Sequence, residues 1–99
     1  MLVHTVYFWL KPEITAAQRA EFVRLVNKLG EIKSVDKIYV GQPAKTGKRA
    51  IIDDSYSYAL TVICQDLKAH DAYQVDPIHD EFRNQCHTFW NRVQIYDAE

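Results

Sequence analysis

Tyr73 and His79 are the two residues of this sequence whose types and spacing most suggest chemistry, and the turn Asp76-Pro77 lies between them. A neutral histidine with a pKa of about 6.5 can take a proton at neutral pH, which suits proton abstraction next to a carbonyl group. A phenol with a pKa of about 10 is a poor base but a good hydrogen-bond donor to a carbonyl or enolate oxygen. We therefore predict His79 as a general base and Tyr73 as the group that stabilises the substrate oxygen or orients its partner.

Two short helices would position this pair. Asp66 can cap a helix over residues 67–74, and Asp76-Pro77 can begin a second helix that runs to about Trp90. His79 would then share one face of the second helix, at the 3.6-residue period, with four further side chains: Phe82, Cys86, Phe89 and Trp90. We expect His79 to lie on the buried face of this helix.

The rest of the chain predicts a sheet and one longer helix. Thr15 and Gln18 match a capping box, and the helix that follows has apolar residues at helical spacing as far as Leu29, before Gly30. A long loop covers residues 42–55. Runs of β-branched and aromatic residues predict strands at residues 2–10, 34–41, 56–64 and 92–97.

The resulting order, β-α-β-β-α-α-β, is typical of a single ferredoxin-like α+β domain over residues 1–99. Such a domain has a four-stranded antiparallel sheet with helices on one face. Strand alternation places His4 and Tyr58 on the helical side of the sheet, where Tyr73 and His79 would meet them. We expect these four polar residues in an apolar pocket, with His4 as a second polar anchor. Its predicted lining comprises His4, Val6, Phe8, Phe22, Val26, Tyr58, Leu60, Phe82, Trp90 and Ile95.

The opposite face of the sheet would carry a contiguous apolar patch. Its members are Val3, Tyr7, Trp9, Tyr39, Ile63 and Tyr96. Patches of this kind are rarely left to water, and a second copy of the chain packed sheet against sheet would cover it. We therefore expect a two-fold homodimer formed through the sheet face.

Charge and composition argue against several partners. A net charge of −1 gives no long-range attraction to nucleic acid or to an anionic membrane, and no apolar run approaches the roughly 18 residues of a membrane span. The N-terminus lacks the features of a signal peptide. The two cysteines, Cys64 and Cys86, lack Cys-x-x-Cys spacing and are expected as buried reduced thiols. These features favour a cytoplasmic protein.

The remaining histidines predict no metal site. A metal ion needs three or four convergent ligands. His79 and His87 stand eight residues apart, which turns them about 80° around a helix. We expect His70 and His87 at exposed helical positions, and we expect neither a metal nor another cofactor.

The pattern resembles the stress-responsive dimeric α/β-barrel (Dabb) family over the whole chain. The resemblance rests on His4, the Tyr73…Pro77-Ile78-His79…Phe82 element and four further segments, Phe22…Leu25…Leu29, Tyr39-Val40-Gly41, Phe89-Trp90 and Ile95-Tyr96-Asp97. It implies a dimeric ferredoxin-like fold, and most members of the family have no assigned reaction.

One plant branch of the family contains polyketide cyclases that perform a cofactor-free aldol condensation. In that branch, the catalytic tyrosine and histidine match Tyr73 and His79, and a pocket histidine matches His4. A pocket histidine of the third strand is replaced here by Tyr58, and a pocket tyrosine of the first helix by Val26.

Three functions remain open from the sequence. The first is a cofactor-independent lyase, cyclase or isomerase acting on a hydrophobic carbonyl compound. The second is a ligand-binding or stress-related protein that uses the same pocket without turnover. The third is a structural dimer whose pocket is vestigial. A shared fold does not distinguish these functions.

Overall fold

Four antiparallel strands form one sheet in the order β2-β3-β1-β4. The computed structural model describes all residues from 1 to 99. β1 is central and pairs with β3 on one side and β4 on the other. This arrangement confirms the predicted ferredoxin-like sheet. The strands are β1 (Leu2–Leu10), β2 (Val35–Gly41), β3 (Tyr58–Cys64) and β4 (Trp90–Ala98).

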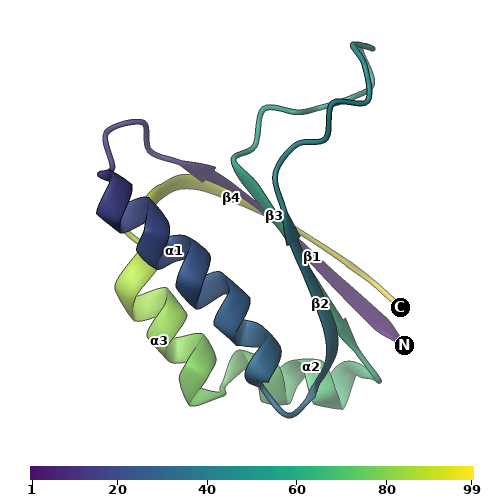
Figure 1. Cartoon of the computed structure of the whole chain (residues 1–99). Helices are drawn as coiled ribbons and strands as arrows, with labels where there is room; N and C mark the ends of the chain where they lie inside the picture. The colour runs from purple at the N-terminus through teal and green to yellow at the C-terminus, as the bar shows by residue number, and fades with distance from the viewer.

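Three α-helices cover one face of this sheet: α1 (Ala16–Lys28), α2 (Leu67–Gln74) and α3 (Pro77–Cys86) (Figure 1). Their first turns form as the sequence predicts. Thr15 and Gln18 form a reciprocal capping box on α1, and Asp66 caps α2. The Asp76 carboxylate accepts a hydrogen bond from the Ile78 backbone N–H at 2.8 Å. These caps place Tyr73 at the end of α2 and His79 in the first turn of α3.

The prediction that the last helix continues to Trp90 is wrong. α3 ends at Cys86, and Trp90 begins β4, where it pairs with Leu10. The Phe89 carbonyl accepts a hydrogen bond from the Lys11 backbone N–H at 2.8 Å. Because pairing with β1 satisfies the Trp90 backbone, Trp90 belongs to β4, and Phe89 lies in the turn that joins α3 to β4.

The segment around Gly30 also differs from the expectation. A short 3₁₀ turn (Leu29–Glu31) follows α1, and Gly30 lies inside it rather than in a left-handed C-terminal cap. A Cβ atom at this position would lie 3.2 Å from the Ile38 side chain, so close approach to β2 accounts for the glycine.

The main core lies between α1 and the sheet. Phe8 of β1, Phe22 of α1 and Phe82 of α3 form a ring cluster, with centroids 5.2–5.9 Å apart. Leu25 and Val26 of α1 are fully buried beside them. This packing fills the space beneath α1. The remaining room on this face of the sheet is beside α2, α3 and β4.

No helix covers the opposite face, as the sequence predicts. We call the residues Val3, Tyr7, Trp9, Tyr39, Ile63 and Tyr96 the open sheet face. Tyr39 and Tyr96 are 56% and 63% exposed, and the ring of Tyr7 lies 6.4 Å from that of Tyr96 between centroids. The single chain therefore leaves a band of partly exposed aromatic surface that no helix covers.

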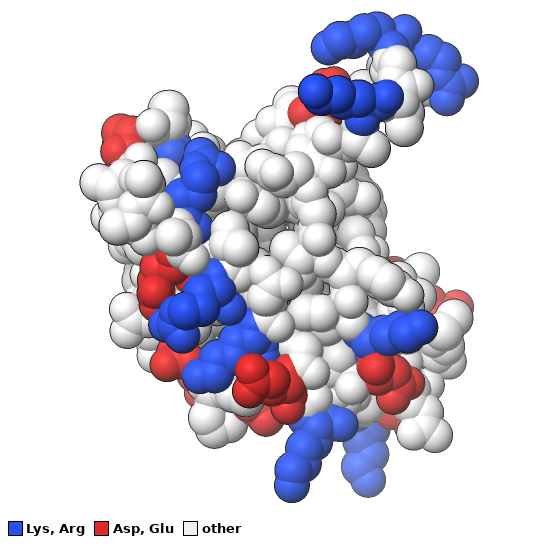
Figure 2. All heavy atoms as spheres, viewed as in Figure 1, with Lys and Arg blue, Asp and Glu red and all other residues white.

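A long connection between β2 and β3 projects away from the sheet (Figure 1). It contains Lys45, Lys48 and Arg49, and basic side chains gather on the projecting segment (Figure 2). Acidic and basic groups are interspersed over the helices in the same view. None of the three helices has the length and apolarity required to cross a bilayer.

Candidate functional site

A cavity of about 340 Å³ lies between the sheet and the pair α2–α3. Aliphatic and aromatic side chains from the sheet and from the helices make up most of its wall, and a few polar groups enter it. The lining residues are His4, Val6, Phe8, Leu60, Tyr73, Gln74, His79, Phe82, Arg83, Trp90, Val93 and Ile95. An apolar hollow with few, convergent polar groups has the composition of a small-molecule site.

Nine of the twelve residues predicted for the site line this cavity. The other three, Phe22, Val26 and Tyr58, do not. Phe22 and Val26 are completely buried beneath α1, where they form the main core. The ring of Tyr58 packs 5.4 Å from that of Phe22, between centroids, instead of facing the cavity. Phe22 and Val26 lie on the buried face of α1, and Tyr58 of β3 has the predicted inward parity but packs against Phe22 of α1.

Tyr73 and His79 contact each other inside the cavity. Their ring centroids are 4.9 Å apart at an interplanar angle of 75°, an edge-to-face arrangement. Tyr73 is 1% exposed and His79 is 8% exposed. The break between α2 and α3 therefore brings the ends of the Tyr73–His79 segment onto one wall.

The imidazole of His79 is held in its neutral form. Burial lowers the pKa of His79 below its ordinary value of 6.5, and the positive charge of Arg83 lowers it further. Its Nδ1 atom is buried without a hydrogen-bond partner in the chain. A neutral imidazole carries a lone pair on one of its two ring nitrogens, as a general base requires.

The phenol of Tyr73 is held in its protonated form. Burial raises the pKa of this phenol well above its ordinary value of 10.0. The hydroxyl therefore keeps its proton at neutral pH and can donate a hydrogen bond to a ligand oxygen. Burial therefore displaces the pKa values of these two neighbouring side chains in opposite directions and keeps both of them neutral.

His4 is fixed by a carboxylate that the sequence reasoning missed. His4 and Asp97 are paired residues of β1 and β4, and His4 Nδ1 lies 2.5 Å from Asp97 Oδ1. Directly paired residues of antiparallel strands project from the same side of the sheet. The parity shared by Val93, Ile95 and Asp97 was the available signal for this contact.

His70 does not lie at an exposed position, so that expectation is wrong. Its side chain is 13% exposed, and its ring centroid lies 4.9 Å from that of His4. His70 precedes Tyr73 by three residues on α2, which places both side chains on the same helical face. That spacing could have predicted the burial. His87 is exposed, as expected.

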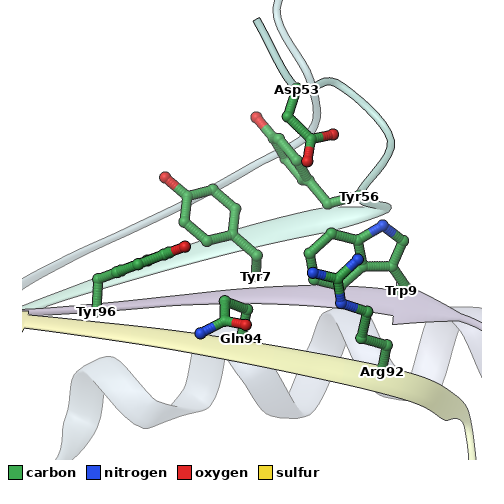
Figure 3. A pocket seen from close by; sticks show the side chains of 7 residues that line it. All are labelled: Tyr7, Trp9, Asp53, Tyr56, Arg92, Gln94 and Tyr96. Atoms are coloured by element: carbon green, nitrogen blue, oxygen red, sulfur yellow. The ribbon is translucent and has the colours of Figure 1, made fainter. Parts of the chain in front are cut away.

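A second cavity, of about 300 Å³, lies on the other side of the sheet (Figure 3). The Arg92 guanidinium stacks over the Trp9 ring, with Cζ 4.1 Å from the ring centroid. Side chains from β1, β4 and the long connection line this second cavity, and all of them lie on the face of the sheet that no helix covers (Figure 3). This hollow therefore lies on the open sheet face, on the side away from the helices.

Replacing His79 with phenylalanine is expected to stabilise the fold. The substitution keeps a ring in the apolar wall and removes the unpartnered Nδ1, whose burial costs free energy. We expect the free energy of unfolding to rise by about 1 kcal/mol, measured by urea denaturation. A clear loss of stability in both His79→Phe and His79→Gln would instead indicate a structural role for the imidazole.

The sequence over residues 2–99 matches the model of the Stress responsive A/B Barrel Domain (Dabb) family. The chain therefore belongs to the Dabb family, which confirms the resemblance drawn from its motifs.

Several known proteins are similar to the chain along most of its length. Olivetolic acid cyclase from Cannabis sativa is 25% identical over 95 residues, which cover 95% of this chain and 91% of that protein. The hydroxynitrile lyase of Passiflora edulis has a similar structure, with a TM-score of 0.78 at 15% identity, over 98% of this chain and 90% of the lyase.

A dimeric ferredoxin-like protein of unknown function from Thermobifida fusca superposes with a TM-score of 0.77 at 18% identity. The match covers 98% of this chain and 88% of that one. At such identities the two structural likenesses show a shared fold alone.

Proposed function

We propose that this chain is a homodimeric Dabb protein that binds a small hydrophobic carbonyl compound between its sheet and helices, and that it performs cofactor-independent acid–base chemistry there. The observation that carries the proposal is the buried His79 imidazole. It has an unpartnered nitrogen and a lowered pKa, and it packs against Tyr73 in an otherwise apolar cavity. The ring nitrogens of a buried histidine with only a structural role would be expected to form hydrogen bonds within the fold.

The proposed step is proton abstraction from the carbon next to the carbonyl group. The C–H bond breaks, His79 takes the proton, and the bonding electron pair becomes the enolate. Tyr73 donates a hydrogen bond to the enolate oxygen, which carries the developing negative charge. The imidazolium then returns its proton either to the same carbon or, after the enolate has attacked a second carbonyl carbon, to the new alkoxide. These two outcomes are an isomerisation-type exchange and an aldol-type cyclisation.

One named relative, at 25% identity, is a cyclase, which supports the aldol-type outcome. The hydroxynitrile lyase shows that an enzyme has the same fold. The proposed homodimer is supported by the aromatic open sheet face and by similar folds described as dimeric. Cys64 and Cys86 are buried free thiols, which favours the reducing cytoplasm.

Exchange of α-protons in deuterated water tests the proposal. The probe is 4-phenyl-2-butanone, because its phenyl ring matches the aromatic wall around Phe8, Phe82 and Trp90, and its methyl ketone supplies exchangeable protons. We expect the protein to accelerate deuterium incorporation, followed by proton NMR. Thermal stabilisation by the probe without exchange would contradict catalysis and favour a non-catalytic ligand-binding protein. If the probe shows neither deuterium exchange nor thermal stabilisation, that result contradicts the proposed site.

The exchange rate should depend on pH through His79. Because burial lowers the pKa of this group, its neutral form is already dominant at pH 7. The rate is therefore expected to be constant at high pH and to fall through a midpoint below pH 6.5, where the imidazole becomes protonated and loses its basicity. A rate profile with its midpoint at or above 6.5 would contradict a buried neutral base.

A further inference from the structure

Three potential metal ligands meet at the edge of the cavity. They are His4 of β1, His70 of α2 and Asp97 of β4, and one ligand atom from each lies within 4.8 Å of the others. The three residues come from distant parts of the chain, so the fold itself assembles the group. Neither Tyr73 nor His79 belongs to this cluster.

The cluster is ordered before any ligand arrives. His4 is 3% exposed and is held by the Asp97 carboxylate opposite it in the sheet. The His70 ring lies edge-to-face against that of His4, with an interplanar angle of 62°. Gln74 Nε2 lies 3.3 Å from His70 Nε2, a contact in which the amide donates and the imidazole nitrogen accepts. His70 Nδ1 lies 3.2 Å from Asp71 Oδ1, so a metal ion at Nε2 would displace the Gln74 amide and take the lone pair that now accepts its hydrogen bond.

An ion would have access to this group. The Asp97 side chain is 47% exposed while both histidine side chains are largely buried, so the cluster opens to solvent at its carboxylate. Asp97 lies on the helical side of β4, in register with His4. A dimer formed through the open sheet face would therefore leave the cluster accessible.

We infer that His4, His70 and Asp97 form a binding site for a divalent transition-metal ion of the Zn²⁺ type. Two imidazoles and one carboxylate are the protein ligands of open sites for such ions, in which water fills the remaining coordination positions. Thiolates, which favour softer ions, are absent from the cluster. An ion bound between His4 and Asp97 would replace the hydrogen bond that now joins His4 Nδ1 to Asp97 Oδ1, two atoms that the fold already places side by side.

Binding of Co²⁺ to the tag-free protein tests the inference. Co²⁺ prefers similar ligands and has a visible absorption spectrum, so the readout does not depend on any enzymatic activity. We expect a saturable spectrum corresponding to one ion per chain, which Zn²⁺ abolishes by competition. His70→Gln and Asp97→Asn preserve side-chain size and should each weaken binding by about 10- to 100-fold.

His87→Ala is the matched control, because His87 is exposed at the end of α3 and does not belong to the cluster. It should bind Co²⁺ as tightly as the wild-type protein. Circular dichroism establishes that each variant is folded. The inference is overturned if the wild-type protein shows no saturable spectrum, if His70→Gln and Asp97→Asn both bind as tightly as wild type, or if His87→Ala abolishes binding.

Discussion

Replacing His79 with alanine is expected to slow α-proton exchange of 4-phenyl-2-butanone by about 10²–10⁴-fold, the usual contribution of a positioned general base. The variant lacks the imidazole that packs against Tyr73 in the cavity. Water that fills the enlarged cavity is a far weaker base than an imidazole. The fold should persist, because the ring that is removed makes no hydrogen bond through its buried Nδ1 atom. Deuterium incorporation measured by proton NMR gives the rate.

His87→Ala is the control for this experiment, because it removes an exposed histidine that follows the same helix. It should leave the exchange rate unchanged. If both variants retain the wild-type rate, or if His87→Ala loses as much as His79→Ala, the assignment of His79 as the base is wrong.

Replacing Tyr7 with aspartate is expected to dissociate the proposed dimer. Tyr7 stands on β1 in the middle of the open sheet face, where its ring packs against those of Tyr56 and Tyr96 (Figure 3). In a sheet-against-sheet dimer, the new carboxylate would be buried without a partner in each copy. A penalty of about 3 kcal/mol would weaken association roughly 100-fold. Light scattering over a dilution series measures the dissociation constant.

The wild-type protein should scatter as a particle of twice the 11.5 kDa chain mass. Gln85→Asp makes the same change in charge at an exposed position of α3, on the helical side, and should remain dimeric. A wild-type protein that is monomeric at micromolar concentration, or a Tyr7→Asp variant that associates like wild type, would contradict the proposed interface.

Strand alternation and helix capping explain why so much of the architecture was predictable. The period of two on β1 places Val6 and Phe8 on the buried side. The caps at Asp66 and Asp76 set the break that joins Tyr73 to His79. Both patterns are local in the sequence, so they can be recognised without knowledge of the tertiary structure.

The errors concern features that packing decides. Trp90 leaves the helical pattern because its backbone pairs with Leu10 across eighty residues of chain. Phe22 and Val26 have the predicted inward orientation, but the position of α1 over the sheet buries them in the core instead of the cavity wall. His70 acquires its contacts from His4, a neighbour that only the assembled fold supplies.

The buried, unpartnered Nδ1 atom of His79 lowers the stability of the fold, and the proposed function would explain why the chain keeps it. A buried nitrogen without a partner destabilises the native state, and the chain nevertheless keeps it beside a cavity. Sites prepared for chemistry commonly sacrifice stability in this way. The expected gain in stability of His79→Phe and the expected loss of exchange in His79→Ala are two consequences of this same feature.

NMR titration of the histidine side chains, with and without 4-phenyl-2-butanone, tests the central claim most directly. His79→Gln assigns the resonances of His79, and exposed His87 serves as an internal reference. The account predicts that His79 titrates below 6.5 and that its resonances shift saturably with the ketone while those of His87 do not. A His79 that titrates at or above 6.5, or that does not respond to the ketone up to its solubility, would contradict a neutral base lining a ligand cavity.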